Sequence, residues 1–178
     1  YEPPDESGRT PGDPGVGADK KERNNLKKYD KLIFVSGSDT STSPMAEAIL
    51  QSKYLLEDIL VDSKGLVVLF PEPINPKAEA VLVSNGLSMK DHTSEPLSPE
   101  DFDERTLILT MDYAQKEKIL TDYDKVKNVY TVGEYIKKND EIRDPYGGDL
   151  SDYGRCFEQL RALITELVVV LNEEELLS

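Results

Sequence analysis

The chain has 178 residues, 38% of them hydrophobic, so it can bury one substantial core and is near the size of one ordinary domain. Its formal net charge of −14 argues against non-specific binding to nucleic acid or to an anionic membrane, because both need a basic surface. No apolar run approaches the roughly 18 residues of a membrane helix, and no signal peptide is visible. We therefore expect a cytoplasmic protein, while tethering by a segment upstream of Tyr1 stays open.

Residues 1–30 contain few apolar side chains and are interrupted by proline and glycine. Such a segment cannot bury enough surface to offset the entropy of ordering it, so it is expected to be a flexible tail or linker. The globular domain is then expected to span residues 31–178.

Beyond the tail, short apolar runs alternate with longer helical patterns, which predicts a parallel sheet covered on both faces. The fold class is therefore α/β, a three-layer sandwich with four parallel strands. Strands are expected at 31–36, 59–63, 106–111 and 128–132. Helices are expected at 44–54, 75–86, 113–120 and about 152–172.

Cys156 is the only cysteine, which excludes an intrachain disulfide and a zinc site made of several cysteines. It falls in the pattern of the last helix, where we expect it to pack in the core rather than to react. The sequence implies no metal and no cofactor.

The segment between the first strand and the first helix reads SGSDTSTS: six hydroxyl-bearing residues, one acid and no base. Ser43 is expected to cap the helix, with Pro44 at its first position. Ligands of parallel sheets bind beyond the carboxyl ends of the strands, and amides before a helix can converge on an anion. This predicts a phosphate cradle made of Ser36, Gly37, Ser38, Asp39, Thr40, Ser41, Thr42 and Ser43.

Several sequence blocks resemble the low-molecular-weight protein tyrosine phosphatases, whose loop reads C-x5-R followed by serine and usually proline. In chain order the blocks are SPMAEA, DSKG, NPKAEAVLVSNGL, DHTSEPL, LILTMD and DPYGG. The resemblance covers Lys31 to Leu171 and implies the fold of that family.

The resemblance also assigns roles residue by residue. In the family the loop cysteine attacks phosphorus, the loop arginine clamps the phosphoryl oxygens, and an aspartate protonates the leaving oxygen. Here the nucleophile position is Ser36, the arginine position is Thr42, and the aspartate is retained as Asp144. Asp39 replaces the usual asparagine that braces the loop, and Ser41 stands where many members have a second cysteine.

These replacements predict impaired catalysis. A thiol can be ionised at a helix N-terminus, whereas a serine hydroxyl needs a general base. The sole histidine, His92, lies in a separate connecting segment, and a structural hydrogen-bonding role is favoured over that of the base. Loss of the arginine removes charge-assisted hydrogen bonds of about 1.5–3 kcal/mol each. Asp39 would repel a phosphate about 4 Å away by about 1–4 kcal/mol, so phosphate monoesters should bind weakly or not at all.

The leading interpretation is therefore a pseudophosphatase, a binding or regulatory module that holds another protein in the former phosphate-loop cleft. That cleft should prefer neutral groups or cationic ones such as arginine or lysine side chains. Tyr146 is expected to line the recognition surface as an exposed aromatic residue. The retention of Asp144 can be structural, because aspartate hydrogen-bonds turn amides.

Two alternatives stay open. The run Ser36, Ser38, Thr40 and Thr42 is similar to the [ST]-x-T-G-x-T loop of flavodoxin-type phosphate and flavin binders, although Asp39 replaces the glycine and no tryptophan is present. A yellow colour would support that reading. Residual hydrolysis by a serine or metal-assisted mechanism is the other, although the D-x-D pattern of aspartyl-phosphate enzymes is absent. The oligomeric state is open as well.

Overall fold

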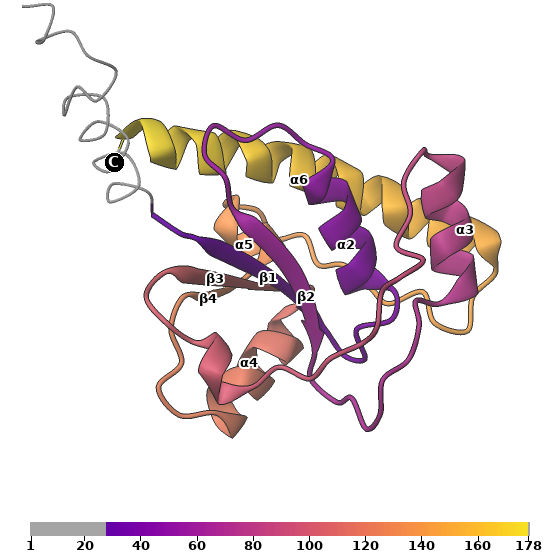
Figure 1. Cartoon of the computed structure of the whole chain (residues 1–178), viewed down its shortest axis with the longest axis horizontal. Helices are drawn as coiled ribbons and strands as arrows, with labels where there is room; N and C mark the ends of the chain where they lie inside the picture. Colours follow the sequence, from indigo (N-terminus) through magenta and orange to yellow (C-terminus); the bar gives the residue numbers. More distant parts are fainter. Residues whose placement is uncertain (1–27, 178) are drawn as a thin grey trace, which may run out of the picture.

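The computed structural model describes residues 28–177, so most of the expected tail lies outside the described residues. Four parallel strands form one sheet in the order β2–β1–β3–β4 (Figure 1). This confirms the predicted α/β fold with a four-stranded parallel sheet. The strands are β1 (Lys31–Ser36), β2 (Leu60–Gly65), β3 (Thr106–Thr110) and β4 (Val129–Thr131).

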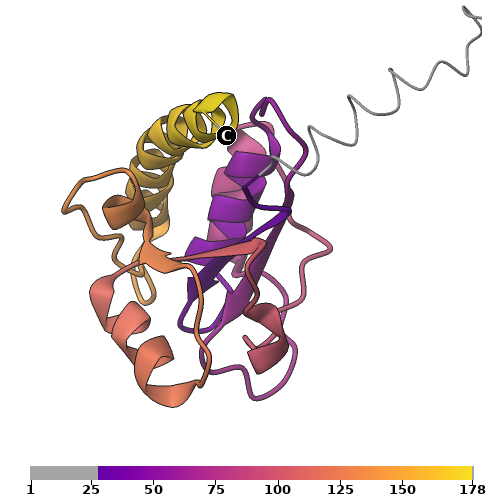
Figure 2. The same ribbon diagram turned by 90° about the vertical axis from the view of Figure 1, so that its left-hand side faces the viewer.

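Helices cover both faces of this sheet. Helices α2, α3 and α6 pack on one another on one face, and α4 lies on the other (Figures 1 and 2). The helices are α2 (Thr42–Gln51), α3 (Pro76–Ser84), the 3-10 turn η2 (Pro99–Asp101), α4 (Tyr113–Asp122), α5 (Val132–Tyr135) and α6 (Leu150–Leu177). The sequence pattern did not predict η2 and α5, which are too short to show a helical period.

Strand β1 runs through the middle of the protein because four consecutive apolar residues are buried on alternating sides. Leu32 and Phe34 belong to the larger core beneath α2, α3 and α6. Ile33 and Val35 belong to the smaller core on the α4 side. A central parallel strand covered on both faces has this uninterrupted apolar sequence.

The last helix is longer at both ends than its apolar pattern indicated. Its final turns are held by Glu174, which accepts hydrogen bonds from the Tyr135 hydroxyl at 2.6 Å and from Lys28 Nζ at 2.7 Å. These partners lie far from Glu174 in sequence, so a local pattern does not reveal them. No helix within residues 28–177 combines the length and apolar composition that a membrane crossing requires.

The folded part of the chain reaches back before Lys31. Tyr29, which the sequence placed in the tail, is buried in the larger core. The Asp30 carbonyl accepts a hydrogen bond from Leu60 N at 2.9 Å, at the start of β2. The expectation of a flexible tail is therefore wrong for residues 28–30.

Candidate functional site

The hydroxyl-rich loop connects the carboxyl end of β1 to the first turn of α2. The helix begins at Thr42, after the N-cap residue Ser41, and not at Pro44 as the sequence suggested. Pro44 is thus the third helical residue, where its missing N–H removes no hydrogen bond, because the first N–H groups of a helix have no partner within it. Ser43 is therefore not the N-cap residue that the sequence predicted.

Three side chains of the loop form a buried chain of hydrogen bonds. Ser36 Oγ and Ser43 Oγ lie 2.7 Å apart, and Ser43 Oγ donates to Asp39 Oδ1 at 2.8 Å. Asp39 N donates back to Ser36 Oγ at 3.1 Å. The predicted nucleophile position is thus linked to the loop carboxylate through one hydroxyl.

Asp39 is the most constrained residue of the loop. It is fully buried, and its backbone has the left-handed φ of +59°, which non-glycine residues adopt rarely. Its second carboxylate oxygen accepts from Glu95 N at 3.1 Å. Burial raises the pKa of Asp39, while the nearby Ser63 hydroxyl and the hydrogen bond from Ser43 oppose the rise.

This geometry corrects one sequence-based expectation. The carboxylate of Asp39 was expected to face a bound phosphate and to repel it. Both of its oxygens are instead held by protein donors, Ser43 Oγ and Glu95 N. Asp39 braces the loop from within, as the family's asparagine is expected to do.

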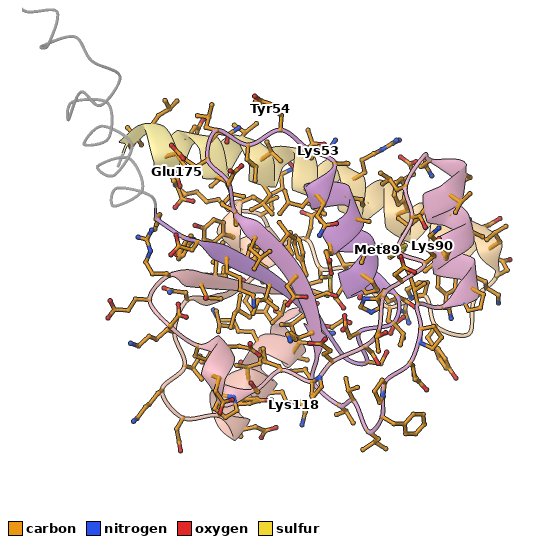
Figure 3. All side chains as sticks on the ribbon, in the orientation of Figure 1. Lys53, Tyr54, Met89, Lys90, Lys118 and Glu175 are labelled. Carbon is orange, nitrogen blue, oxygen red and sulfur yellow. The ribbon has the colours of Figure 1, made fainter. Side chains whose placement is uncertain are left out.

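His92 is brought to the loop although 53 residues separate it from Asp39. Its Nε2 lies 2.7 Å from the Asp39 carbonyl and 3.6 Å from Asp39 Oδ2. A carbonyl can only accept, so Nε2 carries the proton. The segment is anchored by Met89, whose N–H donates to Glu79 on α3, and Figure 3 shows Met89 and Lys90 beside that helix. His92 therefore holds the loop through Asp39 and makes no hydrogen bond with Ser36 in the described residues.

Ser63, in the DSKG block, lies behind the loop. Its buried hydroxyl has no hydrogen-bond partner at ordinary geometry within the described part of the chain. It is nevertheless close enough to the carboxyls of Asp39 and Glu47 to lower the pKa of each, against the larger opposing effect of burial. Sequence reasoning gave Ser63 no role.

The turn after residue 143 forms a second wall of the site. Asp144 Oδ1 accepts from Tyr146 N at 3.0 Å, the turn hydrogen bond expected from the sequence, and Asp144 is exposed. Tyr146 is 82% exposed, as expected for a surface aromatic residue. This turn and the start of α6 line a cavity of about 510 Å³.

Tyr153, on the first turns of α6, connects this wall to the loop. Burial raises the pKa of its hydroxyl, which the neighbouring Ser41 hydroxyl lowers and the nearby Asp144 charge raises further. Asp144 therefore lies on the same side of the molecule as the loop. Cys156, one turn later, is buried, and burial raises the pKa of its thiol to about 12, which fits the packing role expected for it.

A third wall, which the sequence did not indicate, is apolar. The segment after β2 is joined to the loop by Val67 N, which donates to the Gly37 carbonyl at 2.9 Å. Leu69 and Phe70 follow with most of their surface exposed, beside a cavity of about 170 Å³ that Ser38 also lines. Exposed apolar groups of this size next to a loop are typical of a contact surface.

Within residues 28–177, no lysine or arginine side chain donates a hydrogen bond to residues 36–43. The ammonium of Lys77, on the nearby α3, donates to the Gly148 carbonyl at 2.6 Å. Thr42, at the arginine position, is itself buried. No group of three potential metal-ligating side chains gathers in the described residues.

Comparison with known proteins identifies the family. Residues 31–176 match the family described as low molecular weight phosphotyrosine protein phosphatase. The chain belongs to this family. The low molecular weight protein-tyrosine-phosphatase PtpB of Staphylococcus haemolyticus is 31% identical over 141 residues, which are 77% of this chain and 96% of that protein.

Solved structures agree with this assignment. The YwlE arginine phosphatase from Geobacillus stearothermophilus has a TM-score of 0.76 at 29% identity, covering 82% of this chain and 95% of its own. The low molecular weight protein tyrosine phosphatase from T. tengcongensis has a TM-score of 0.73 at 30% identity, covering 78% and 97%. A cysteine-to-serine mutant of YwlE arginine phosphatase with a phosphorylated active site serine has a TM-score of 0.72 at 29% identity, covering 78% and 93%.

Proposed function

We propose that this phosphatase-family domain does not hydrolyse phosphate monoesters and instead holds a protein partner at the loop cleft. The observation that carries the proposal is the chemistry at the loop ends. Hydroxyls of Ser36 and Thr42 stand where the resemblance places the family's thiol and guanidinium, and in the described residues no lysine or arginine side chain donates a hydrogen bond to the loop. A phosphate dianion would thus lose its charge-assisted bonds.

The partner group that best fits the cleft is an arginine side chain. Asp144 is exposed, and among residues 28–177 only its Oδ1 has a hydrogen-bond partner, which leaves Oδ2 to accept from a guanidinium. The exposed ring of Tyr146 offers a face on which a guanidinium can stack. Two similar structures are named arginine phosphatases, which supports arginine as the recognised group.

The binding test compares three matched peptides that differ at one residue: arginine, alanine or phosphotyrosine. The arginine peptide should bind the protein best, and Asp144→Asn should weaken it by about tenfold, as loss of a charge-assisted hydrogen bond predicts. Lys118→Ala, on the α4 side of the sheet (Figure 3), is the matched surface control. Preference for the phosphotyrosine peptide would contradict the proposal.

A separate measurement distinguishes a loop that does not react with phosphate monoesters from one whose serine takes up a phosphoryl group and keeps it. The cysteine-to-serine relative is described with a phosphorylated active site serine, so a hydroxyl in this loop can carry a phosphoryl group. Incubation of this protein with p-nitrophenyl phosphate, followed by peptide mass spectrometry, should find Ser36 unmodified, because Thr42 cannot clamp the phosphoryl oxygens. A phosphorylated Ser36 would contradict the proposed loss of phosphate binding.

A further inference from the structure

The buried hydrogen-bond chain of the loop has a fixed direction. Ser43 has a single hydroxyl proton, which it donates to Asp39 Oδ1. At its 2.7 Å contact with Ser36 Oγ, Ser43 must therefore accept. The proton of Ser36 thus points to Ser43, and the proton of Ser43 points to the carboxylate.

The residue at position 39 decides this direction. An asparagine, which the family resemblance leads one to expect, carries an NH₂ donor and an oxygen acceptor, so Ser43 could be bonded either way. An aspartate only accepts. A thiolate nucleophile needs donors around it, whereas a serine hydroxyl needs a route by which its proton can leave. An aspartate at position 39 can therefore take up the proton that a serine nucleophile at position 36 has to lose.

Asp39 is also suited to receive a proton. It is fully buried, and burial raises its pKa, so protonation is easier than for an exposed carboxylate. Its position is fixed by Glu95 N and by the bond between its carbonyl and His92. The acceptor therefore stays aligned with Ser43.

The loop backbone supplies donors for a developing oxyanion. The amides of Ser38, Thr40 and Thr42 have no acceptor within the described residues, and they lie before or in the first turn of α2. Such donors stabilise the single negative charge of a tetrahedral intermediate. Without a lysine or arginine bonded to the loop in the described residues, these amides suit a neutral substrate better than a phosphate dianion.

We propose that Ser36 is a nucleophile towards uncharged carboxylic esters, with Ser43 passing its proton to Asp39. The bond from Ser36 Oγ to the carbonyl carbon forms as the Ser36 proton moves to Ser43 and the Ser43 proton moves to Asp39. The carbonyl oxygen becomes an oxyanion held by the loop amides. Ser36 is the catalytic residue, and Ser43 and Asp39 act through it.

The remaining steps restore the starting state. Collapse of the oxyanion breaks the bond to the alcohol, which takes a proton from Ser43, and Asp39 returns its proton to Ser43. Water then attacks the acyl carbon and loses one proton along the same route. The carboxylic acid leaves as Ser36 regains a proton. The net reaction is ester plus water to acid plus alcohol.

The test uses a tagged fluorophosphonate, a neutral electrophile that traps a nucleophilic serine. A bond from Ser36 Oγ to phosphorus forms, the P–F bond breaks and fluoride leaves, while the Ser36 proton moves to Ser43 and the Ser43 proton moves to Asp39. Peptide mass spectrometry should find the adduct on Ser36, and Ser36→Ala should abolish it. Asp39→Asn should slow labelling by at least about 100-fold, the lower range of general-base effects.

Asp101→Asn is the matched control. Asp101 also accepts a backbone hydrogen bond, from Ser98 N at 2.9 Å, but lies in η2, outside the loop. This variant should label at the natural rate. Circular dichroism and a thermal melt confirm that each variant is folded, and rates are compared per folded molecule. No adduct on Ser36, or equal labelling of Asp39→Asn, would overturn the proposal.

A pH profile separates proton transfer from a purely structural role. The labelling rate of the natural protein should rise as Asp39 loses its proton and then level off, and Asp39→Asn should lack this rise. The titratable groups that act on Asp39 are His92, whose charge lowers its pKa, and Glu47 of α2, coupled to it electrostatically. His92→Gln should shift the rise to higher pH without abolishing it. A profile of the same shape in Asp39→Asn would refute the relay. Phosphatase inactivity is measured separately, so either proposal can fail alone.

Discussion

The loop at residues 36–43 and the turn at residues 144–148 differ in which side chains they expose. In the loop, the resemblance places Ser36 and Thr42 at the family's reactive positions; both are buried, and Ser36 is hydrogen-bonded to Ser43, which donates to Asp39. In the turn, Asp144 and Tyr146 are both exposed. The turn therefore offers exposed side chains to a protein partner, whereas the loop offers its backbone amides and links Ser36, Ser43 and Asp39 in an internal chain of hydrogen bonds.

The largest expected effect concerns Asp144 in a repaired loop. In the background Ser36→Cys, Asp39→Asn, Thr42→Arg, the further change Asp144→Asn should lower p-nitrophenyl phosphate turnover by about 10²–10⁴-fold, as removal of a general acid does. The turn would then be shown to have kept its catalytic geometry. Equal rates with and without Asp144 would mean that the turn, too, has lost its function.

Glycines near the two regions should respond differently to alanine. A Cβ at Gly65 would lie 2.7 Å from Val68 Cγ2 and 2.9 Å from the Ser38 backbone, so Gly65→Ala should destabilise the protein by about 1–3 kcal/mol. Gly154, in the first turns of α6, has open space at that position, so Gly154→Ala should stabilise by about 0.5–1 kcal/mol. Urea unfolding measures both, and a similar cost for the two would contradict the close packing beneath the loop.

The buried Asp39 should make stability depend on pH. Its folded pKa is raised by burial above the unfolded value of about 3.9, so its contribution to stability is largest below that value and is lost as pH rises through the folded pKa. Because an asparagine does not ionise, Asp39→Asn removes this loss of stability at higher pH. Thermal melts should therefore show a gain in stability from Asp39→Asn that grows as the pH rises above about 4. A gain that is constant with pH would show that Asp39 titrates normally.

The smallest effect on stability is expected at the exposed turn. Tyr146→Ala should change the free energy of unfolding by less than about 0.5 kcal/mol, because the side chain is 82% exposed. The same variant should weaken the arginine peptide by about 0.5–1 kcal/mol through loss of stacking. Calorimetry measures the affinity, and an unchanged affinity would remove Tyr146 from the recognition surface.

Local patterns in the sequence were sufficient for the sheet and for the position of the loop. The buried run of β1 and the alternation of strands and helices predicted the fold, and the Ser43-Pro44 pair located the start of α2 to within two residues. The turn hydrogen bond of Asp144 was expected because it joins residues two apart. Features formed by residues close together in the chain could thus be predicted from the sequence.

Contacts between segments that are distant in the chain could not be predicted from the sequence. The approach of His92 and Glu95 to Asp39 depends on how the segment after α3 crosses the end of the sheet. The same is true of the exposed Leu69 and Phe70, whose strand-like apolar sequence does not reveal that they project outwards beside the loop. Consequently the sequence located the loop between β1 and α2, but it assigned the Asp39 carboxylate to the wrong side of that loop.

The central claim is that the loop residues alone explain a lack of phosphatase activity on an otherwise intact scaffold. It is tested most directly by p-nitrophenyl phosphate hydrolysis, measured side by side for the natural protein and the triple variant Ser36→Cys, Asp39→Asn, Thr42→Arg. We predict no turnover by the natural protein and a gain on the order of 10³-fold or more in the variant. Phosphatase activity of the natural protein, abolished by Ser36→Ala, would contradict the claim.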